Sequence, residues 1–110
     1  MLAHVAILRE YLAERFDRGY EAFAECRENI SRAPSTYLKQ MYYDTVNFDQ
    51  NCIELAIKFA GADHILAGSD YPHQIGSIPK MLDAVSRLPV SPAQREGIAG
   101  RNAAQLLGVK

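Results

Sequence analysis

The nine residues Ile65–His73, with the sequence ILAGSDYPH, decide how the rest of the chain is interpreted. They continue an apolar run, His64–Gly68, that is too short for a helix and ends at a glycine, which predicts a buried strand. Asp70 follows two residues later. Reactive groups of parallel α/β folds lie just beyond the carboxyl ends of strands, so Asp70 is a candidate functional carboxylate. Because aspartate also caps many βα turns, the spacing alone leaves a purely structural role open.

The residues before this stretch complete a strand–helix–strand unit. The segment Met41–Val46 concentrates aromatic and β-branched residues between breakers, and we predict a short buried strand there. Asn47 and Asp49 can both cap the helix that follows, whose apolar face ends at Gly61. A helix-sized spacer between two strands predicts that the strands are parallel.

Helices are expected on both sides of this unit. An amphipathic pattern predicts a helix over residues 4–16 that ends near Gly19, and residues 20–30 are weakly helical. Pro34 breaks this pattern, and Ser35 can cap a short helix over residues 36–40.

Start and stop signals mark three further helices after the second strand. Ser77 begins a helix that continues to Leu88, and Ser91 has capping-box spacing before the next one. A last helix runs from about Asn102 to Leu107 and ends at a glycine. The fold class is therefore α/β, with two parallel strands and several helices.

Composition narrows the class of protein. The chain has 110 residues, 48% hydrophobic and 23% charged, so we expect one globular domain over residues 1–110. A formal net charge of −1 argues against a nucleic-acid partner. No apolar run approaches the roughly 20 residues of a membrane span, and no signal-peptide core follows the first residues, so a cytoplasmic protein is expected. Cys26 and Cys52 are interpreted as buried thiols.

Two parallel strands are too few to form a sheet that stands alone, because both faces and both edges need cover. A TIM (β/α)8 barrel takes about 250 residues, and this chain is about the size of its last third. We therefore expect either a fragment of such a barrel or a chain that completes itself by association. A self-contained α+β domain with a minimal sheet stays open at this point.

Specific strings add to this interpretation. The segments Gly68–His73 and Gly100–Gly108 resemble the closing part of the amidohydrolase-related family, in its aminocarboxymuconate-semialdehyde decarboxylase-like branch. Arg15–Tyr20, Glu28–Ile30 and Tyr42–Thr45 resemble the family's segment before its seventh strand. The resemblance implies the C-terminal part of a metal-dependent TIM barrel, with strands seven and eight at 42–46 and 65–68. Members of this family decarboxylate or hydrolyse small carboxylated, often aromatic, compounds.

The resemblance also implies roles for three residues. Asp70 falls on the aspartate that ligates a divalent metal, usually zinc, and can share a proton with the activated water. His4 falls on a catalytic histidine that follows the sixth strand, and an imidazole titrates near neutrality. Arg15 falls where some members send an arginine into a neighbouring subunit to hold a substrate carboxylate, which its guanidinium can bind in bidentate fashion. Only three residues precede His4, so we expect no strand ahead of it.

The family's other metal ligands follow its first and fifth strands, and no counterpart of those segments is present in this sequence. One carboxylate does not hold a catalytic zinc, which takes three protein ligands and a water. The leading hypothesis is therefore the C-terminal portion of a metal-dependent decarboxylase or hydrolase, inactive as an isolated chain and part of a homo-oligomer. The alternative is a non-catalytic interaction domain that self-associates through open strand edges and apolar helix faces.

Five other residues near the candidate site receive weaker interpretations. Asp44 ends the neighbouring strand and can line the same rim as Asp70. We expect His73 to pack the loop and His64 to be structural. Tyr42 and its neighbour Tyr43 must point to opposite faces of their strand, so at most one reaches the rim.

Overall fold

A sheet of three short parallel strands lies at the centre of the computed structural model, which describes the backbone of residues 2–3 and 7–109 and the side chains of residues 11–109. The strands are β1 (Leu2–Ala3), β2 (Tyr42–Asp44) and β3 (Ile65–Leu66), in the order β1-β2-β3. The parallel pairing of β2 with β3 confirms the predicted strand–helix–strand unit.

The third strand corrects our count. We predicted two strands and none ahead of His4, but Leu2 pairs with Tyr42 and Ala3 with Tyr43 at the edge of the sheet. Two residues are too few to show any alternation of polar and apolar side chains, so β1 is specified by its partner strand and leaves no local signal. His4, the next residue in the sequence, lies outside the described residues.

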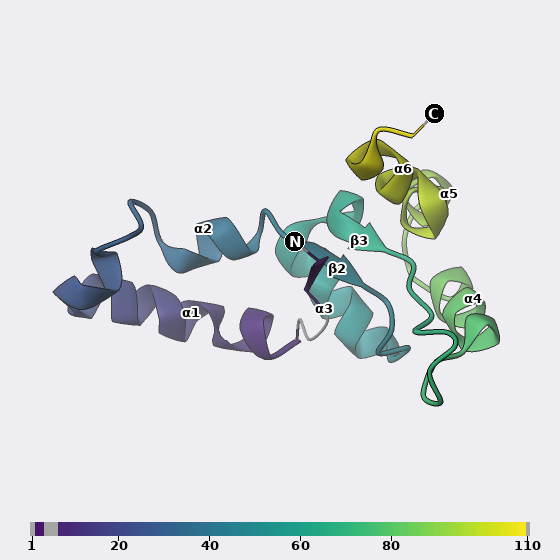
Figure 1. Cartoon of the computed structure of the whole chain (residues 1–110), viewed down its shortest axis with the longest axis horizontal. Coiled ribbons are helices and arrows are strands. Elements are labelled where there is room, and N and C mark those ends of the chain that lie inside the picture. The colour runs from purple at the N-terminus through teal and green to yellow at the C-terminus, as the bar shows by residue number, and fades with distance from the viewer. Residues whose placement is uncertain (1, 4–6, 110) are drawn as a thin grey trace.

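Helices flank the sheet on both sides. Figure 1 shows α1 and α2 side by side in an arm that extends away from the sheet, while α4, α5 and α6 gather at the opposite side. The α-helices of the described residues are α1 (Ile7–Ala22), α2 (Pro34–Leu38), α3 (Gln50–Ala60), α4 (Ile78–Ser86), α5 (Pro92–Glu96) and α6 (Asn102–Leu107). Short 3₁₀ turns cover Ala24–Arg27 and Ala62–His64, and a π-helical turn, Gly97–Arg101, joins α5 to α6.

Most predicted helix boundaries are confirmed by their caps. The Asp49 carboxylate accepts the N–H of Cys52 at 3.1 Å, and this bond lowers the pKa of Asp49 below its usual value. Ser77 caps α4 in the same way at 3.2 Å, and Ser91 forms both bonds of a capping box at the start of α5. Gly108 ends α6 with a left-handed φ of 66°.

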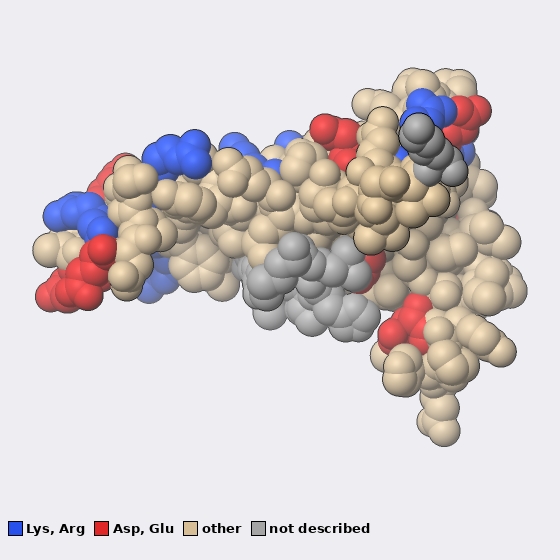
Figure 2. All heavy atoms as spheres, turned by 45° about the horizontal axis from the view of Figure 1, so that its top comes forward, with Lys and Arg blue, Asp and Glu red and all other residues tan. Residues whose placement is uncertain are grey.

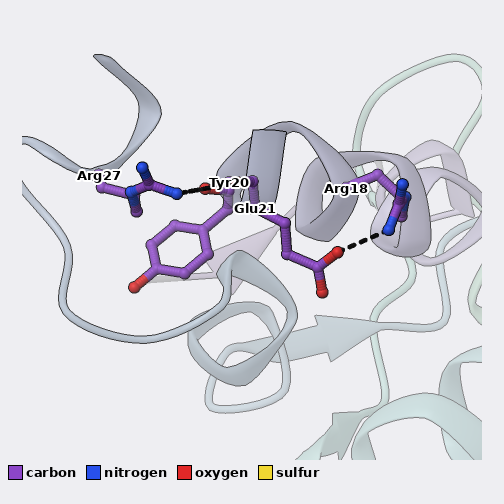
Figure 3. Close-up of polar contacts among 4 residues, drawn as sticks. All are labelled: Arg18, Tyr20, Glu21 and Arg27. Carbon is purple, nitrogen blue, oxygen red and sulfur yellow. Dashed lines mark hydrogen bonds and ion pairs between the residues drawn. The ribbon is translucent and has the colours of Figure 1, made fainter. Parts of the chain in front are cut away.

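The first helix is longer than we predicted. Instead of ending near Gly19, α1 continues to Ala22. Arg27 accounts for part of this extension, because its guanidinium donates to the Tyr20 and Glu21 carbonyls at 3.0 and 2.9 Å, at the end of the helix. An ion pair of 2.7 Å between Arg18 and Glu21 crosses the predicted break (Figure 3). These side-chain contacts offset the low helix propensity of glycine.

The short helix α2 also begins two residues before the predicted start. Pro34 is its first residue, with Ala33 rather than Ser35 at the cap. Proline suits this position because the first helical residue needs no N–H donor. The N–H of Ser35 instead donates to the Asp17 carboxylate at 2.9 Å, which ties α2 to α1.

The core packs against one face of the sheet. Tyr43 and Ile65 are fully buried there, and the Tyr43 hydroxyl donates to the Leu38 carbonyl at 2.6 Å. Tyr42 points the other way and stacks on His64 with 4.6 Å between ring centroids, which confirms that the two tyrosines occupy opposite faces. The other core side chains come from α3, α4 and the segments around them, and they are Ile53, Ala56, Ala62, Ala84, Val85, Leu88 and Ile98.

Basic and acidic side chains are interspersed along the arm and at the other end of the molecule on the face that Figure 2 shows. Among the helices of the described segments, none has the length and apolar character that crossing a bilayer requires.

Asn102 fastens α6 to the sheet. Its side chain is 7% exposed, and its amide donates to the carbonyls of Ala62 and Ile65 at 2.8 and 2.9 Å. These two carbonyls flank the turn that leads into β3. Asn102 therefore anchors the start of the strand whose far end leads to Asp70.

Replacing this side chain tests the anchor. Asn102→Ala removes the side-chain donor of the Ile65 carbonyl and leaves the Ala62 carbonyl with only the Ile65 N–H, so we expect the free energy of unfolding to fall by about 1–3 kcal/mol. Urea denaturation followed by circular dichroism measures the change. Asn51→Ala, at an exposed position of α3, is the matched control and should stay within about 0.5 kcal/mol of the wild type.

Candidate functional site

Asp70 lies in the loop between β3 and α4, and its backbone conformation is unusual. The strand ends at Leu66 and the chain reaches Asp70 four residues later. Asp70 has a φ of 55°, in the left-handed region, and is half-buried. This conformation costs an L-residue roughly 1–2 kcal/mol, although aspartate tolerates it better than most. The surrounding structure must therefore hold Asp70 in place.

Backbone hydrogen bonds close the loop at its base and divide it into two turns. The N–H of Ser77 donates to the Ser69 carbonyl at 2.7 Å, which joins the two ends of the loop. Inside it, His73 donates to the Asp70 carbonyl and Gly76 donates to the His73 carbonyl, both at 2.9 Å. The Ser69 hydroxyl accepts the N–H of Tyr71 at 3.2 Å. Asp70 thus lies near the start of a loop that is held together by backbone hydrogen bonds between its own residues.

Gly76 packs directly against the backbone of Asp70. A Cβ atom at this position would lie 2.3 Å from the Asp70 carbonyl oxygen and 2.7 Å from the N atom of Tyr71. Real atoms do not approach so closely, so only glycine fits here. The conformation of Asp70 depends on this contact.

The end of β2 lies beside the start of the same loop. A Cβ atom at Gly68 would lie 3.2 Å from the Cβ atom of Asp44, so the two backbones are in close contact. The buried Thr45 hydroxyl accepts the N–H of Gly68 at 3.1 Å and lies 3.3 Å from the Gly68 carbonyl, to which it can donate. The Asp44 carboxylate accepts the N–H of Val46 at 3.2 Å. Asp44 therefore borders the strand end that leads to Asp70, and its place on the same rim as Asp70 stays a prediction.

The described side chains supply only part of a metal site. No three histidine, cysteine, aspartate or glutamate side chains among residues 11–109 gather closely enough to hold an ion. Asp70 and Asp44 carry hard oxygen donors, which suit divalent cations. The donors fit one side of such a site, and further ligands would have to come from outside these residues.

The structure separates Arg15 from this loop. Arg15 is an exposed residue of α1, in the arm that extends away from the sheet, whereas Asp70 lies between β3 and α4 (Figure 1). His4 falls outside the described residues, so its position relative to Asp70 stays a prediction.

Of the two remaining histidines, His64 makes the structural contacts that we expected, whereas the exposed side chain of His73 does not pack the loop as predicted. His73 is exposed and contributes its backbone to the two turns of the loop. His64 stacks on Tyr42, and its Nδ1 atom lies 2.9 Å from the Met41 carbonyl oxygen, in a structural arrangement.

Sequence reasoning missed Thr45, Ser69 and Gly76, which shape the loop. Each acts through a single contact with the backbone, and none belongs to a recognisable catalytic pattern. The only available signals were a threonine near the end of the first predicted strand and a glycine directly before the Ser77 cap.

A tyrosine with a shifted pKa, Tyr37, lies on the arm formed by α1 and α2. Hydrogen bonds from Ser31, through its side chain and then its backbone, and from Arg32 lower the pKa of Tyr37 to about 8. The Arg32 guanidinium also lies 5.3 Å from the centre of the tyrosine ring. The ring borders an apolar cavity of about 360 Å³ that is lined by Phe16, Ile30, Pro34, Tyr37 and Leu38.

Known proteins resemble this chain in sequence and in fold. The model of the amidohydrolase family matches residues 1–109. A curated relative, the 2-amino-3-carboxymuconate-6-semialdehyde decarboxylase of Caenorhabditis elegans, is 27% identical over 84 residues. These residues cover 76% of this chain and 21% of the relative.

Two solved decarboxylases share the fold. The dihydroxybenzoic acid decarboxylase of Polaromonas sp. JS666, solved with bound manganese and the inhibitor 2-nitroresorcinol, is 27% identical with a TM-score of 0.77. The 2,6-dihydroxybenzoate decarboxylase from Rhizobium is 26% identical with the same TM-score. The aligned region covers 91% of this chain and 30% and 31% of theirs.

These likenesses define the class of protein as the C-terminal part of a TIM (β/α)8 barrel, which confirms the predicted fold class. With the family model matching nearly the whole sequence, the chain belongs to the amidohydrolase family. The predicted family resemblance is confirmed. The chain spans about a fifth of the length of the curated relative and about 30% of that of the solved enzymes.

The contact between Gly76 and Asp70 can be tested by adding one methyl group. Gly76→Ala forces the two backbone segments apart, so we expect a loss of about 1–3 kcal/mol in unfolding free energy. The amide resonances of Asp70 and Tyr71 should shift. In Gly100→Ala the added methyl meets no atom within 4 Å. Because alanine favours a helical turn, this control should gain about 0.5–1 kcal/mol.

The Tyr37 pKa predicts a pH-dependent contribution to stability. The folded pKa of about 8 lies below the ordinary value of 10.0, so the contribution is present at high pH and is lost as the pH falls from about 10 to about 8. Tyrosinate absorbance should show one group that ionises near pH 8. This step should disappear in Tyr37→Phe and persist in Tyr11→Phe. Its persistence in Tyr37→Phe would refute the assignment.

Proposed function

We propose that this chain forms the C-terminal part of a metal-dependent decarboxylase that acts on small carboxylated, often aromatic, compounds. The observation that carries the proposal is the presentation of Asp70 at the mouth of the closed loop that follows β3. The relatives support this reaction type, because the curated protein and both solved enzymes are decarboxylases by name. Hydrolysis, the other reaction of the family, is the second choice on these grounds.

In this proposal Asp70 would help to hold the metal, and its carboxylate would be able to exchange a proton with a nearby water molecule. A divalent metal would supply a Lewis acid that polarises a substrate oxygen and lowers the pKa of bound water. We propose zinc first, from the family resemblance, and manganese second, because the Polaromonas enzyme was solved with manganese. Carboxylate oxygens serve as ligands for both ions.

His4 and Arg15 complete the proposed machinery. His4 would move the proton that replaces the lost carboxyl group, since an imidazole exchanges protons near neutral pH. Arg15 would hold a substrate carboxylate through a charge-assisted bidentate contact. Because the arm that carries Arg15 extends away from its own β3–α4 loop, we propose that it serves the site of a second copy in a homo-oligomer.

The isolated chain should be inactive under this proposal. One carboxylate ligand falls short of the three protein ligands of a catalytic zinc, and the described side chains contain no group of three. We treat residues 1–110 as one partial barrel domain, whose missing ligands come from segments with no counterpart here.

A non-catalytic domain that self-associates is the alternative. It is favoured by large apolar side chains that are exposed in this chain, among them Tyr11 at 79% and Leu107 at 74%. In that case Asp70 would serve only the backbone of its own loop and would show no preference for a cation.

Manganese ions test the proposed role of Asp70 directly. Mn²⁺ broadens the amide resonances of nearby residues even when it binds weakly. We expect broadening centred on residues 68–73 and on Asp44 in spectra of the full 110-residue chain. Asp70→Asn removes the charged ligand, so the broadening should then disappear.

Asp63→Asn is the matched control, because Asp63 is an exposed aspartate that precedes β3 at the other end of the strand. Broadening at residues 68–73 should persist in this variant. If Mn²⁺ instead broadens all acidic positions equally, or if Asp70→Asn has no effect, the metal role is wrong and the self-associating domain is the better description.

A further inference from the structure

Thr45, the residue that follows β2, connects this strand to the Asp70 loop. It is fully buried, and its N–H donates to the Leu66 carbonyl at 3.1 Å as the last ladder bond between β2 and β3. Its hydroxyl accepts the N–H of Gly68 at 3.1 Å and can donate to the Gly68 carbonyl at 3.3 Å. Both polar groups of Gly68 are thus directed at one side-chain oxygen.

This hydroxyl takes the place of a missing ladder bond. In a parallel pair, a residue whose N–H donates to a carbonyl of the neighbouring strand usually accepts a second bond at its own carbonyl. The donor of that second bond is the N–H two residues further along the neighbouring strand. For Thr45 that donor would be Gly68. The Thr45 carbonyl instead accepts the N–H of Phe48 at 2.9 Å. The chain can therefore turn away toward α3 while the end of β3 stays attached to β2.

The attachment point lies just ahead of Asp70. Gly68 precedes it by two residues, and the loop closes one residue later through the bond between Ser69 and Ser77. Gly68 also lies so close to β2 that a Cβ atom would come within 3.1 Å of the Val46 side chain. The Thr45 hydroxyl therefore fixes where the Asp70 loop begins relative to the neighbouring strand.

We propose that Thr45 is a positioning residue that holds the Asp70 carboxylate in place for a divalent cation. This inference rests on the proposed metal role of Asp70. Thr45 acts through the backbone of Gly68 and touches neither the cation nor the substrate. Removing the hydroxyl leaves the partly buried N–H of Gly68 without this acceptor and frees the loop to shift, which spreads the carboxylate over several positions.

The test compares two substitutions of similar size. Thr45→Val keeps the shape and removes the hydroxyl, whereas Thr45→Ser keeps the hydroxyl and removes a methyl group. We expect the Mn²⁺ affinity, measured from the broadening at residues 68–73, to fall at least about tenfold in Thr45→Val, as for other partners that orient a ligand. Thr45→Ser should recover most of this loss. Thr36→Val, on the arm, should bind as the wild type does.

A second readout needs no metal. The amide hydrogen of Gly68 should exchange slowly with solvent in the wild type and in Thr45→Ser, and much faster in Thr45→Val. If Thr45→Val does not fold, Thr45→Ala takes its place, and Thr45→Ser must then exceed Thr45→Ala in both readouts. Rapid exchange at Gly68 in the folded wild type would overturn the inference.

The two readouts separate the possible failures. If the wild type binds no Mn²⁺ at Asp70, the proposed function fails and the metal role of Thr45 fails with it. This holds even when the amide hydrogen of Gly68 exchanges slowly with solvent. If the wild type binds Mn²⁺ at Asp70 and Thr45→Val binds equally well, only the role of Thr45 is wrong.

Discussion

The strands β2 and β3 lie side by side in a register that pairs Tyr43 with Ile65 and Asp44 with Leu66. Side chains alternate between the two faces of a strand, so this register sends Tyr43 and Ile65 into the core. If β2 slipped by one residue, its two faces would be exchanged, and Asp44 would be buried in place of Tyr43. The same register brings Thr45 opposite the chain that leads to Asp70. Core packing and the geometry of the candidate site therefore depend on one pairing of two short strands.

The sequence predicts those features that have a local chemical signal. Asp49, Ser77 and Ser91 cap helices through their own side chains, so their residue types identify them. The apolar run before Gly68 identifies β3. Asp70 is then a candidate because reactive groups of parallel α/β folds lie just beyond the carboxyl ends of strands. Features that depend on a distant partner were missed or misplaced. The strand β1 needs β2, and the extension of α1 past Gly19 is supported by Arg27, eight residues further along.

The conformation of Asp70 belongs to the second group. Its left-handed backbone is a property of the loop, and the contact with Gly76 and the bond from Ser77 to Ser69 become visible only when the chain is folded. Sequence reasoning can thus say which carboxylate follows the strand, but it cannot say how tightly the carboxylate is held. That second property decides how useful a ligand is, because a group ordered in advance loses less entropy on binding.

A metal site assembled from several strands links ion binding to the completion of the barrel. Each ligand alone binds weakly, and the ligands converge only when their strands pair, so the free energy of binding also stabilises the closed barrel. A segment that carries one ligand contributes most when its own loop is already rigid. The hydrogen bonds from Gly68 to Thr45 and from Ser77 to Ser69, which hold the two ends of the loop, join residues of this chain that lie within 45–77. The strained backbone of Asp70 is therefore held by contacts that this chain itself contains, and any remaining ligands would meet a loop whose backbone is already ordered before they arrive.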